Sequence, residues 1–174
     1  MAKKYGRAGR YAAALVLLAA SLVLGSRDTV INRTRAGREK VPAPAARARV
    51  TRVIDGDTVV IDNGCRVRYI GVDTPETRHP KKGVEYFGKE ASDFNRRLVA
   101  GKKIRLEYDA EKFDKYGRLL AYVYADGVFV NAELVVAGYA RARPVPPNTK
   151  HADLFLDLQS KAKAGKKGLW SRIE

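Results

Sequence analysis

Two short acidic clusters carry the oxygen-rich side chains that a hard divalent cation binds. Residues 55–57 read Asp-Gly-Asp between two β-branched runs, and residues 73–76 read Asp-Thr-Pro-Glu. Asp57 and Asp73 could each supply a carboxylate ligand, and Thr74 could supply its backbone carbonyl. Either Asp55 or Glu76 could act through a bound water. Each cluster alone is also typical of a turn or a helix cap. Taken singly, neither cluster establishes a cation site.

Two arginines could complete such a site. Arg68 lies five residues before Asp73 and shares the side-chain parity of Ile70 and Val72. We therefore expect Arg68 to face the interior, where a charge is costly unless it has a partner, and a structural salt bridge is the alternative. Arg118 follows a glycine turn and could equally be a solvated surface charge. A guanidinium matches phosphate oxygens with two parallel hydrogen bonds, so phosphate is the ligand these arginines suggest.

Four motifs occur together in this sequence: IDGDTV at 54–59, VDTPET at 72–77, HPKKGVE at 79–85 and DKYGR at 114–118. The combination is highly specific, and AYVYADG and a final LWS accompany it. On these motifs the sequence resembles the staphylococcal nuclease family over roughly residues 49–171. The resemblance implies a calcium-dependent nuclease that hydrolyses DNA and RNA to 3′-phosphorylated products.

The resemblance also implies a role for each matching residue. Calcium would be held by the carboxylates of Asp57 and Asp73 and the carbonyl of Thr74. Glu76 would position or deprotonate the attacking water. The phosphate-binding residues would be two guanidiniums at the scissile group, two residues at a terminal phosphate and two loop lysines: Arg68 and Arg118, Lys115 and Tyr116, and Lys81 and Lys82.

Elementary electrostatics agrees with these roles. Phosphodiester hydrolysis builds negative charge on the phosphoryl oxygens, which one metal and two guanidiniums can neutralise. A carboxylate near a cation has a lowered pKa, so we expect Glu76 to act through proximity more than through basicity. A site with few carboxylates binds calcium weakly, which suits a calcium-rich extracellular setting.

One segment departs from the family. The family has two tyrosines against which a nucleotide base packs, whereas residues 141–147 here read RARPVPP without an aromatic. Stacking contributes about 1–3 kcal/mol per base. We therefore expect weaker base packing, and more phosphate-driven affinity through Arg141 and Arg143.

The elements that must position these residues follow from periodicity. The β-branched or alternating runs predict strands at 50–54, 58–61, 66–72, 103–108, 119–124 and 128–130, with an Asn63-Gly64 hairpin turn. Stripes of 3.6-residue period predict helices at 84–99, 131–137 and 152–164. This order predicts an α+β fold with a mostly β core, an OB-fold. Such a domain is a five-stranded Greek-key barrel, here with about three packed helices.

Composition limits the remaining possibilities. The chain has 174 residues and a formal charge of +15, which favours a nucleic-acid partner. Residues 1–25 combine a basic start with the uncharged run 11–25, which predicts a signal peptide or an N-terminal anchor. The composition of residues 26–46 predicts a flexible linker. Residues 47–174 are then the nuclease domain. We expect an exported monomer that prefers single strands and is secreted or periplasmic. The alternatives are a membrane-anchored nuclease for DNA processing or uptake, tethered through residues 11–25, and a non-catalytic binding module.

Overall fold

The computed structural model describes residues 46–77 and 83–172. The interpretations of residues 1–45, and of Lys81 and Lys82, lie outside the described residues. Within the described ranges, no helix is long and apolar enough to cross a membrane.

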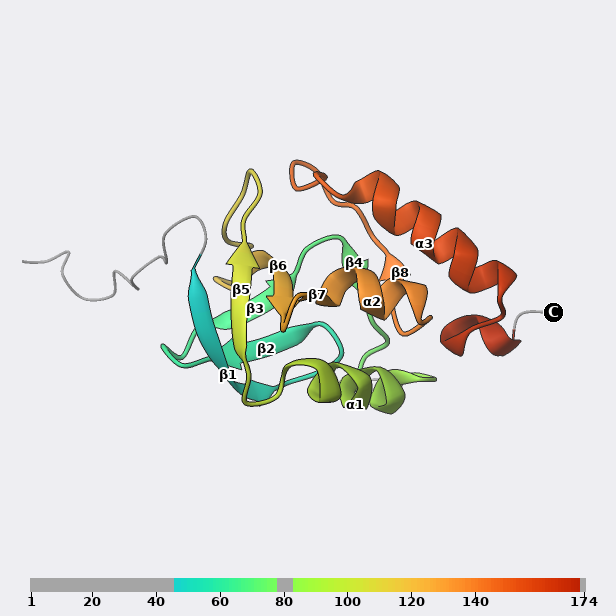
Figure 1. Ribbon diagram of the computed structural model, residues 1–174, viewed down its shortest axis with the longest axis horizontal. Helices are drawn as coiled ribbons and strands as arrows, with labels where there is room; N and C mark the ends of the chain where they lie inside the picture. Colours follow the sequence, from blue (N-terminus) through green and yellow to red (C-terminus); the bar gives the residue numbers. More distant parts are fainter. Residues whose placement is uncertain (1–45, 78–82, 173–174) are drawn as a thin grey trace, which may run out of the picture. The chain divides into compact units, whose positions relative to one another are not determined.

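Five strands close into a barrel (Figure 1): β1 Arg47–Val53, β2 Thr58–Ile61, β3 Arg66–Tyr69, β5 Lys103–Glu107 and β6 Leu119–Ala125. Neighbours pair in the order β3-β2-β1-β5-β6, and a parallel pairing of β3 with β6 closes the ring. The register of β1 shifts between Val50 and Arg52. A bulge of this kind bends a strand, so β1 pairs with β5 through its first half and with β2 through its second. The predicted OB-fold barrel is confirmed.

The predicted strand 66–72 is wrong as a single strand, because Ile70 and Gly71 interrupt it. Gly71 has φ +75°, and a β-carbon there would lie 2.7 Å from the Phe155 ring. The chain turns at this glycine. After this turn comes the short strand β4 Val72–Asp73, which pairs with β8 Arg141–Ala142, a strand after α2, in a sheet separate from the barrel. A hairpin strand, β7 Val128–Phe129, pairs with the end of β6.

Three α-helices and a terminal 3₁₀ turn accompany the barrel: α1 Gly88–Val99, α2 Val130–Val136, α3 Ala152–Ala164 and η1 Gly168–Arg172. α3 has the predicted bounds, whereas α1 begins four residues later than the predicted 84. Phe87 has φ 69°, a left-handed conformation that a continuous helix excludes. A β-carbon at Gly88 would lie 2.8 Å from the Glu76 carbonyl oxygen, so glycine permits α1 to start directly beside the second acidic cluster.

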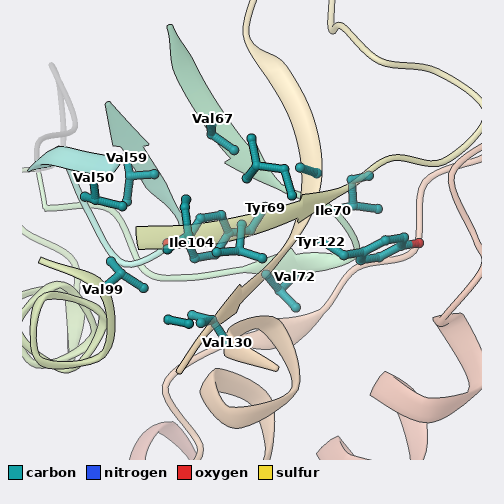
Figure 2. Packing of buried hydrophobic residues seen from close by; sticks show 14 of the residues in the cluster. Val50, Val59, Val67, Tyr69, Ile70, Val72, Val99, Ile104, Tyr122 and Val130 are labelled. Atoms are coloured by element: carbon teal, nitrogen blue, oxygen red, sulfur yellow. The ribbon is translucent and has the colours of Figure 1, made fainter. Parts of the chain in front are cut away.

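The core lies inside the barrel and between the barrel and its helices. Figure 2 shows strand residues such as Val50, Val59 and Val67 converging there with Val99 at the end of α1 and Val130 at the start of α2. Cys65 is also buried, in agreement with the sequence. Burial of this apolar surface is the main driving force that holds the site-bearing strands in place.

Polar crosslinks fix the turn that precedes β4. The buried Asn131 side chain accepts a hydrogen bond from the Val123 N–H at 2.9 Å and donates one to the Ile70 carbonyl at 2.9 Å. A buried amide satisfied on both sides joins α2, β6 and the Ile70-Gly71 turn into one unit. The position of β4, and of the acidic residue at its end, therefore depends on contacts distant in sequence.

Candidate active site

The two acidic clusters meet at the Asp57 carboxylate, which is 1% exposed. Its Oδ2 accepts hydrogen bonds from the Thr74 backbone N–H at 2.8 Å and from the Thr74 hydroxyl at 2.9 Å. Gly56 allows this approach, because a β-carbon there would lie 2.7 Å from the Thr74 side chain. Segments 17 residues apart are thereby held in contact.

Arg68 lies between the two carboxylates that the sequence assigned to the cation site. Its guanidinium forms an ion pair with Asp57 Oδ1 and another with Asp73 Oδ1, the second at 2.7 Å. The expectation that Arg68 faces the core is wrong, because Val67 and Tyr69 take the inward positions of β3 and leave Arg68 on the opposite face. Burial lowers the pKa of Arg68, and the charge of Asp73 opposes that shift. The ion pair anticipated as an alternative is present.

Asp55 is held by α1 and organises the turn before β2. Its Oδ1 accepts the Asp57 N–H at 3.2 Å, and its carbonyl accepts the Asn95 amide at 3.1 Å. The buried Asn95 in turn accepts the Tyr69 hydroxyl at 3.0 Å. Burial raises the pKa of Asp55, and the nearby charge of Arg68 opposes that shift. Sequence reasoning missed Asn95, which is recognisable only as a polar residue on the buried stripe of α1.

Glu76 lies exposed just beyond β4, and its backbone is fixed on both sides. Its N–H donates to Glu85 Oε2 at 3.2 Å, and its carbonyl accepts the Glu85 N–H at 2.9 Å. Partial burial raises the pKa of the Glu76 carboxyl. The negative charges of Asp55 and Asp73 raise this pKa further, and the positive charge of Arg68 lowers it. In the protein without a bound cation, burial is the main cause of this rise, and the expected lowering beside a calcium ion stays a prediction.

Arg118 is oriented by Asp114, at the other end of the same glycine turn. The Arg118 Nε donates to Asp114 Oδ2 at 2.7 Å, and the N–H groups of Arg118 and Tyr116 both donate to Oδ1 at 2.9 Å. Gly117 has φ +76°, which lets the turn close. A carboxylate with three donors holds the loop rigidly, so Arg118 is preorganised although it does not contact Asp57 or Asp73.

A pocket of about 550 Å³ brings the two arginines together. Its basic and hydroxyl lining comes from β3, the 114–118 turn and the segment after β8: Arg68, Arg118, Lys115, Tyr116 and Arg143. Its apolar lining contains Phe113, Val145, Pro146 and Pro147. Phe113 is an aromatic residue that the sequence analysis missed, because it belongs to a different loop from residues 141–147. A pocket lined by both cations and apolar side chains suits a nucleotide.

The two arginines expected to act together in residues 141–147 are separated. Arg143, whose side chain is 64% exposed, donates from Nη1 to Asp73 Oδ2 at 3.1 Å and lines the pocket. The Arg141 guanidinium instead lies 5.9 Å from the centre of the Trp170 ring, outside the pocket lining. Arg143 therefore belongs to the site and Arg141 does not.

Four of the predicted residues line the pocket, namely Arg68, Lys115, Tyr116 and Arg118, and Arg68 connects it to the carboxylates. Asp57 contacts both Thr74 and Arg68, and Asp73 contacts Arg68. The charges of Glu76 and Arg118 interact electrostatically with this group of residues. In the part of the chain that the structure describes, no group of three or more His, Cys, Asp or Glu side chains is placed to hold a metal ion. The predicted calcium set contains only two such side chains, with a backbone carbonyl as the third ligand.

A closed OB barrel with a pocket lined by two guanidiniums, one of them paired with two carboxylates, suits an enzyme that cleaves the phosphodiesters of nucleic acid. The family model described as "Staphylococcal nuclease homologue" matches residues 66–172. The thermonuclease of Staphylococcus hyicus is 45% identical over 126 residues, covering 71% of this chain and 75% of that protein. Endonuclease YncB of Bacillus subtilis is 42% identical over 159 residues, covering 84% and 75%. The chain belongs to the staphylococcal nuclease family and is a nuclease.

Proposed function

We propose that this protein is an exported, calcium-dependent nuclease that cleaves DNA and RNA and leaves 3′-phosphorylated ends. The nuclease domain is residues 47–174. The observation that carries the proposal is the Arg68 guanidinium, which pairs with the carboxylates of Asp57 and Asp73 and also lines the pocket that Arg118 lines. Two carboxylates and two guanidiniums in one place are what a metal-assisted attack on a phosphodiester requires.

The residues present fit a calcium ion. The Oδ1 atoms of Asp57 and Asp73 converge on a single cationic group, Arg68, so one cation can reach both. With the carbonyl of Thr74 they form an all-oxygen ligand set, which a hard cation prefers. Bound there, calcium would stabilise negative charge on the phosphoryl group. A set with only two carboxylates predicts weak binding, as suits a calcium-rich medium.

The side chains divide the work of hydrolysis. Glu76 positions a water molecule and accepts its proton as the water oxygen attacks phosphorus. Arg68 and Arg118 bind the phosphoryl oxygens, where negative charge increases. The bond between phosphorus and the 5′-oxygen breaks, the 5′-oxygen acquires a proton, and the phosphate stays on the 3′-oxygen.

Further cations bind the rest of the substrate. Lys115 lies beside Tyr116, with its Nζ 5.1 Å from the ring centre, and the Tyr116 side chain is exposed at the pocket rim. We assign both residues to a terminal phosphate. Lys81 and Lys82, which follow Glu76 closely in the sequence, remain candidates for contacts with the nucleic-acid strand.

Export is proposed from the N-terminal sequence. Residues 11–25 carry no charge and follow a basic segment, a pattern that indicates either a cleaved signal peptide or an anchor with the domain outside the cell. N-terminal sequencing of the mature protein distinguishes the two fates. A start near residue 26 indicates secretion, and an intact N-terminus in the membrane fraction indicates tethering.

Cleavage of single-stranded DNA by the full chain should require calcium and stop when a calcium chelator is added. The expected result follows from the two-carboxylate ligand set, which binds weakly enough for the ion to be removed. Gel analysis of product length and a 3′-phosphatase treatment of the products measure activity and end chemistry. An Asp73→Asn variant should need more calcium for half-maximal activity. DNA that is bound but uncut at every calcium concentration would favour the non-catalytic binding module.

Arg143→Gln should lower the salt dependence of DNA binding, whereas Arg141→Gln should not. Each phosphate contact with a single strand contributes about 0.7 to the slope of log affinity against log salt. Arg143 lines the pocket and Arg141 lies against Trp170, so the two variants are matched in charge and in chain segment. Fluorescence anisotropy over a salt series measures both slopes. Equal slopes for the two variants would contradict the assignment of Arg143 to phosphate binding.

A further inference from the structure

Four basic side chains share one outer face of the barrel, on β1 and β5, which lie side by side in Figure 1. The antiparallel register places them directly opposite one another in two pairs: Arg47 with Arg105, and Arg49 with Lys103. All four are exposed, while the alternating pair Ala48 and Ile104 is buried in the core. We call these four residues the β1–β5 basic strip.

Acidic neighbours do little to neutralise the strip. Glu107 lies 3.3 Å from Arg105, but its other oxygen is already within 2.7 Å of Lys150 Nζ and 3.3 Å of His151. Among the described residues, no ion pair involves the remaining three members of the strip; the Arg49 guanidinium donates to the Gly101 carbonyl at 2.8 Å, and the Asp62 carboxylate accepts the Arg49 backbone N–H, at 3.2 Å. Like charges placed directly opposite in a sheet are destabilising, so this arrangement carries an electrostatic cost in the isolated domain. An anionic ligand would remove the repulsion.

The form of the strip suits a phosphate backbone. Side chains two residues apart on a strand lie about 6.5–7 Å from each other and neighbouring strands about 5 Å apart, so the strip offers several cations to a repeating anion. The Arg105 guanidinium lies 3.7 Å from the centre of the Tyr124 ring, which orders it for a planar contact with phosphate.

The surroundings favour a nucleic acid over a lipid bilayer. The exposed positions of this face on β1 and β5 are polar or charged, with Thr51 continuing the row on β1. Beyond Thr51, a shallow hollow of about 330 Å³ is lined by Arg52 and Arg96, so the basic surface extends towards the end of α1. Binding in a membrane interface needs apolar side chains that enter the lipid, and the exposed positions of β1 and β5 carry none.

We propose that the β1–β5 basic strip is a second nucleic-acid-binding surface, which holds phosphates of the substrate strand outside the catalytic pocket. None of its four residues lines that pocket. The proposal rests on the proposed nuclease function, because the substrate supplies the polyanion. Its consequence is a preference for long strands over substrates too short to reach the strip.

The test compares two double variants of the full chain with equal charge change, Arg47→Gln/Lys103→Gln and Lys166→Gln/Lys167→Gln. The second pair is exposed beyond the end of α3. Binding of a dye-labelled polynucleotide is measured in chelator over a salt series, and cleavage is measured with calcium on a long strand and on a dinucleotide. Loss of two phosphate contacts should weaken binding roughly tenfold near 0.1 M salt and lower the salt slope by about 1.4. Dinucleotide turnover should not change, and the control pair should stay close to the wild type.

Each outcome decides the proposal. Equal losses in the two double variants, or none, overturn it. Weakened binding to phosphatidylglycerol vesicles with unchanged DNA binding also overturns it, and assigns the strip to a lipid surface. A wild type that cuts nothing, but whose binding depends on the strip, refutes the proposed function and leaves the second surface in place. Melting temperatures of both variants near that of the wild type establish that the fold is intact.

Discussion

Glu76→Gln is expected to lower turnover by about 10²–10⁴-fold while DNA affinity changes little, since this is the range general base catalysis contributes. Glutamine keeps the size of the side chain but cannot accept the proton of the attacking water. The backbone of residue 76 is held by Glu85 and by the close approach of Gly88, so the substitution leaves the local fold unchanged.

The measurement is single-turnover cleavage at saturating calcium, together with binding of the strand in chelator. Glu90→Gln is the matched control, because Glu90 is an exposed acid in the first turn of α1 and undergoes the same charge change. Turnover within a few-fold of the wild type would remove Glu76 from the role of water-activating group. A parallel loss in Glu90→Gln would show that net charge, and not the position of Glu76, controls the rate.

Arg118→Ala is expected to lower turnover by about 10²–10³-fold, the usual effect of removing one preorganised donor to a developing oxyanion. Arg118→Lys should recover only part of the rate, because an ammonium group restores the charge but not the bidentate fork. Arg118 is already held by the Asp114 carboxylate, so little reorganisation is needed when substrate binds.

Arg97→Ala provides the control, because Arg97 is exposed in the last turn of α1 and lies outside the pocket lining. The 114–118 turn should survive in Arg118→Ala, since Asp114 keeps its hydrogen bonds to the N–H groups of residues 116 and 118. A melting temperature near that of the wild type checks this point. If Arg118→Ala cleaves within a few-fold of normal, then Arg68 alone holds the scissile phosphate.

The sequence alone predicted the parts of this protein that depend on neighbouring residues. The Asn63-Gly64 turn between β2 and β3, the bounds of α3 and the barrel architecture followed from turn chemistry and periodicity. The acidic clusters and the DKYGR motif identified the family because each is a short run of consecutive residues, which can be recognised without knowing the tertiary structure. These features depend on backbone preferences and on side chains a few residues apart.

Only the tertiary structure decided which side chains meet. Arg68 faces the carboxylates because β3 buries its neighbours, and the Phe155 ring approaches Gly71 so closely that only glycine fits at the break. Likewise, Arg143 reaches Asp73 from 70 residues away, and Phe113 joins the pocket from a different loop. Periodicity gives a residue's face within its own element but not the element that will lie opposite. That partner is chosen by burial of the whole core, which involves residues from the entire domain.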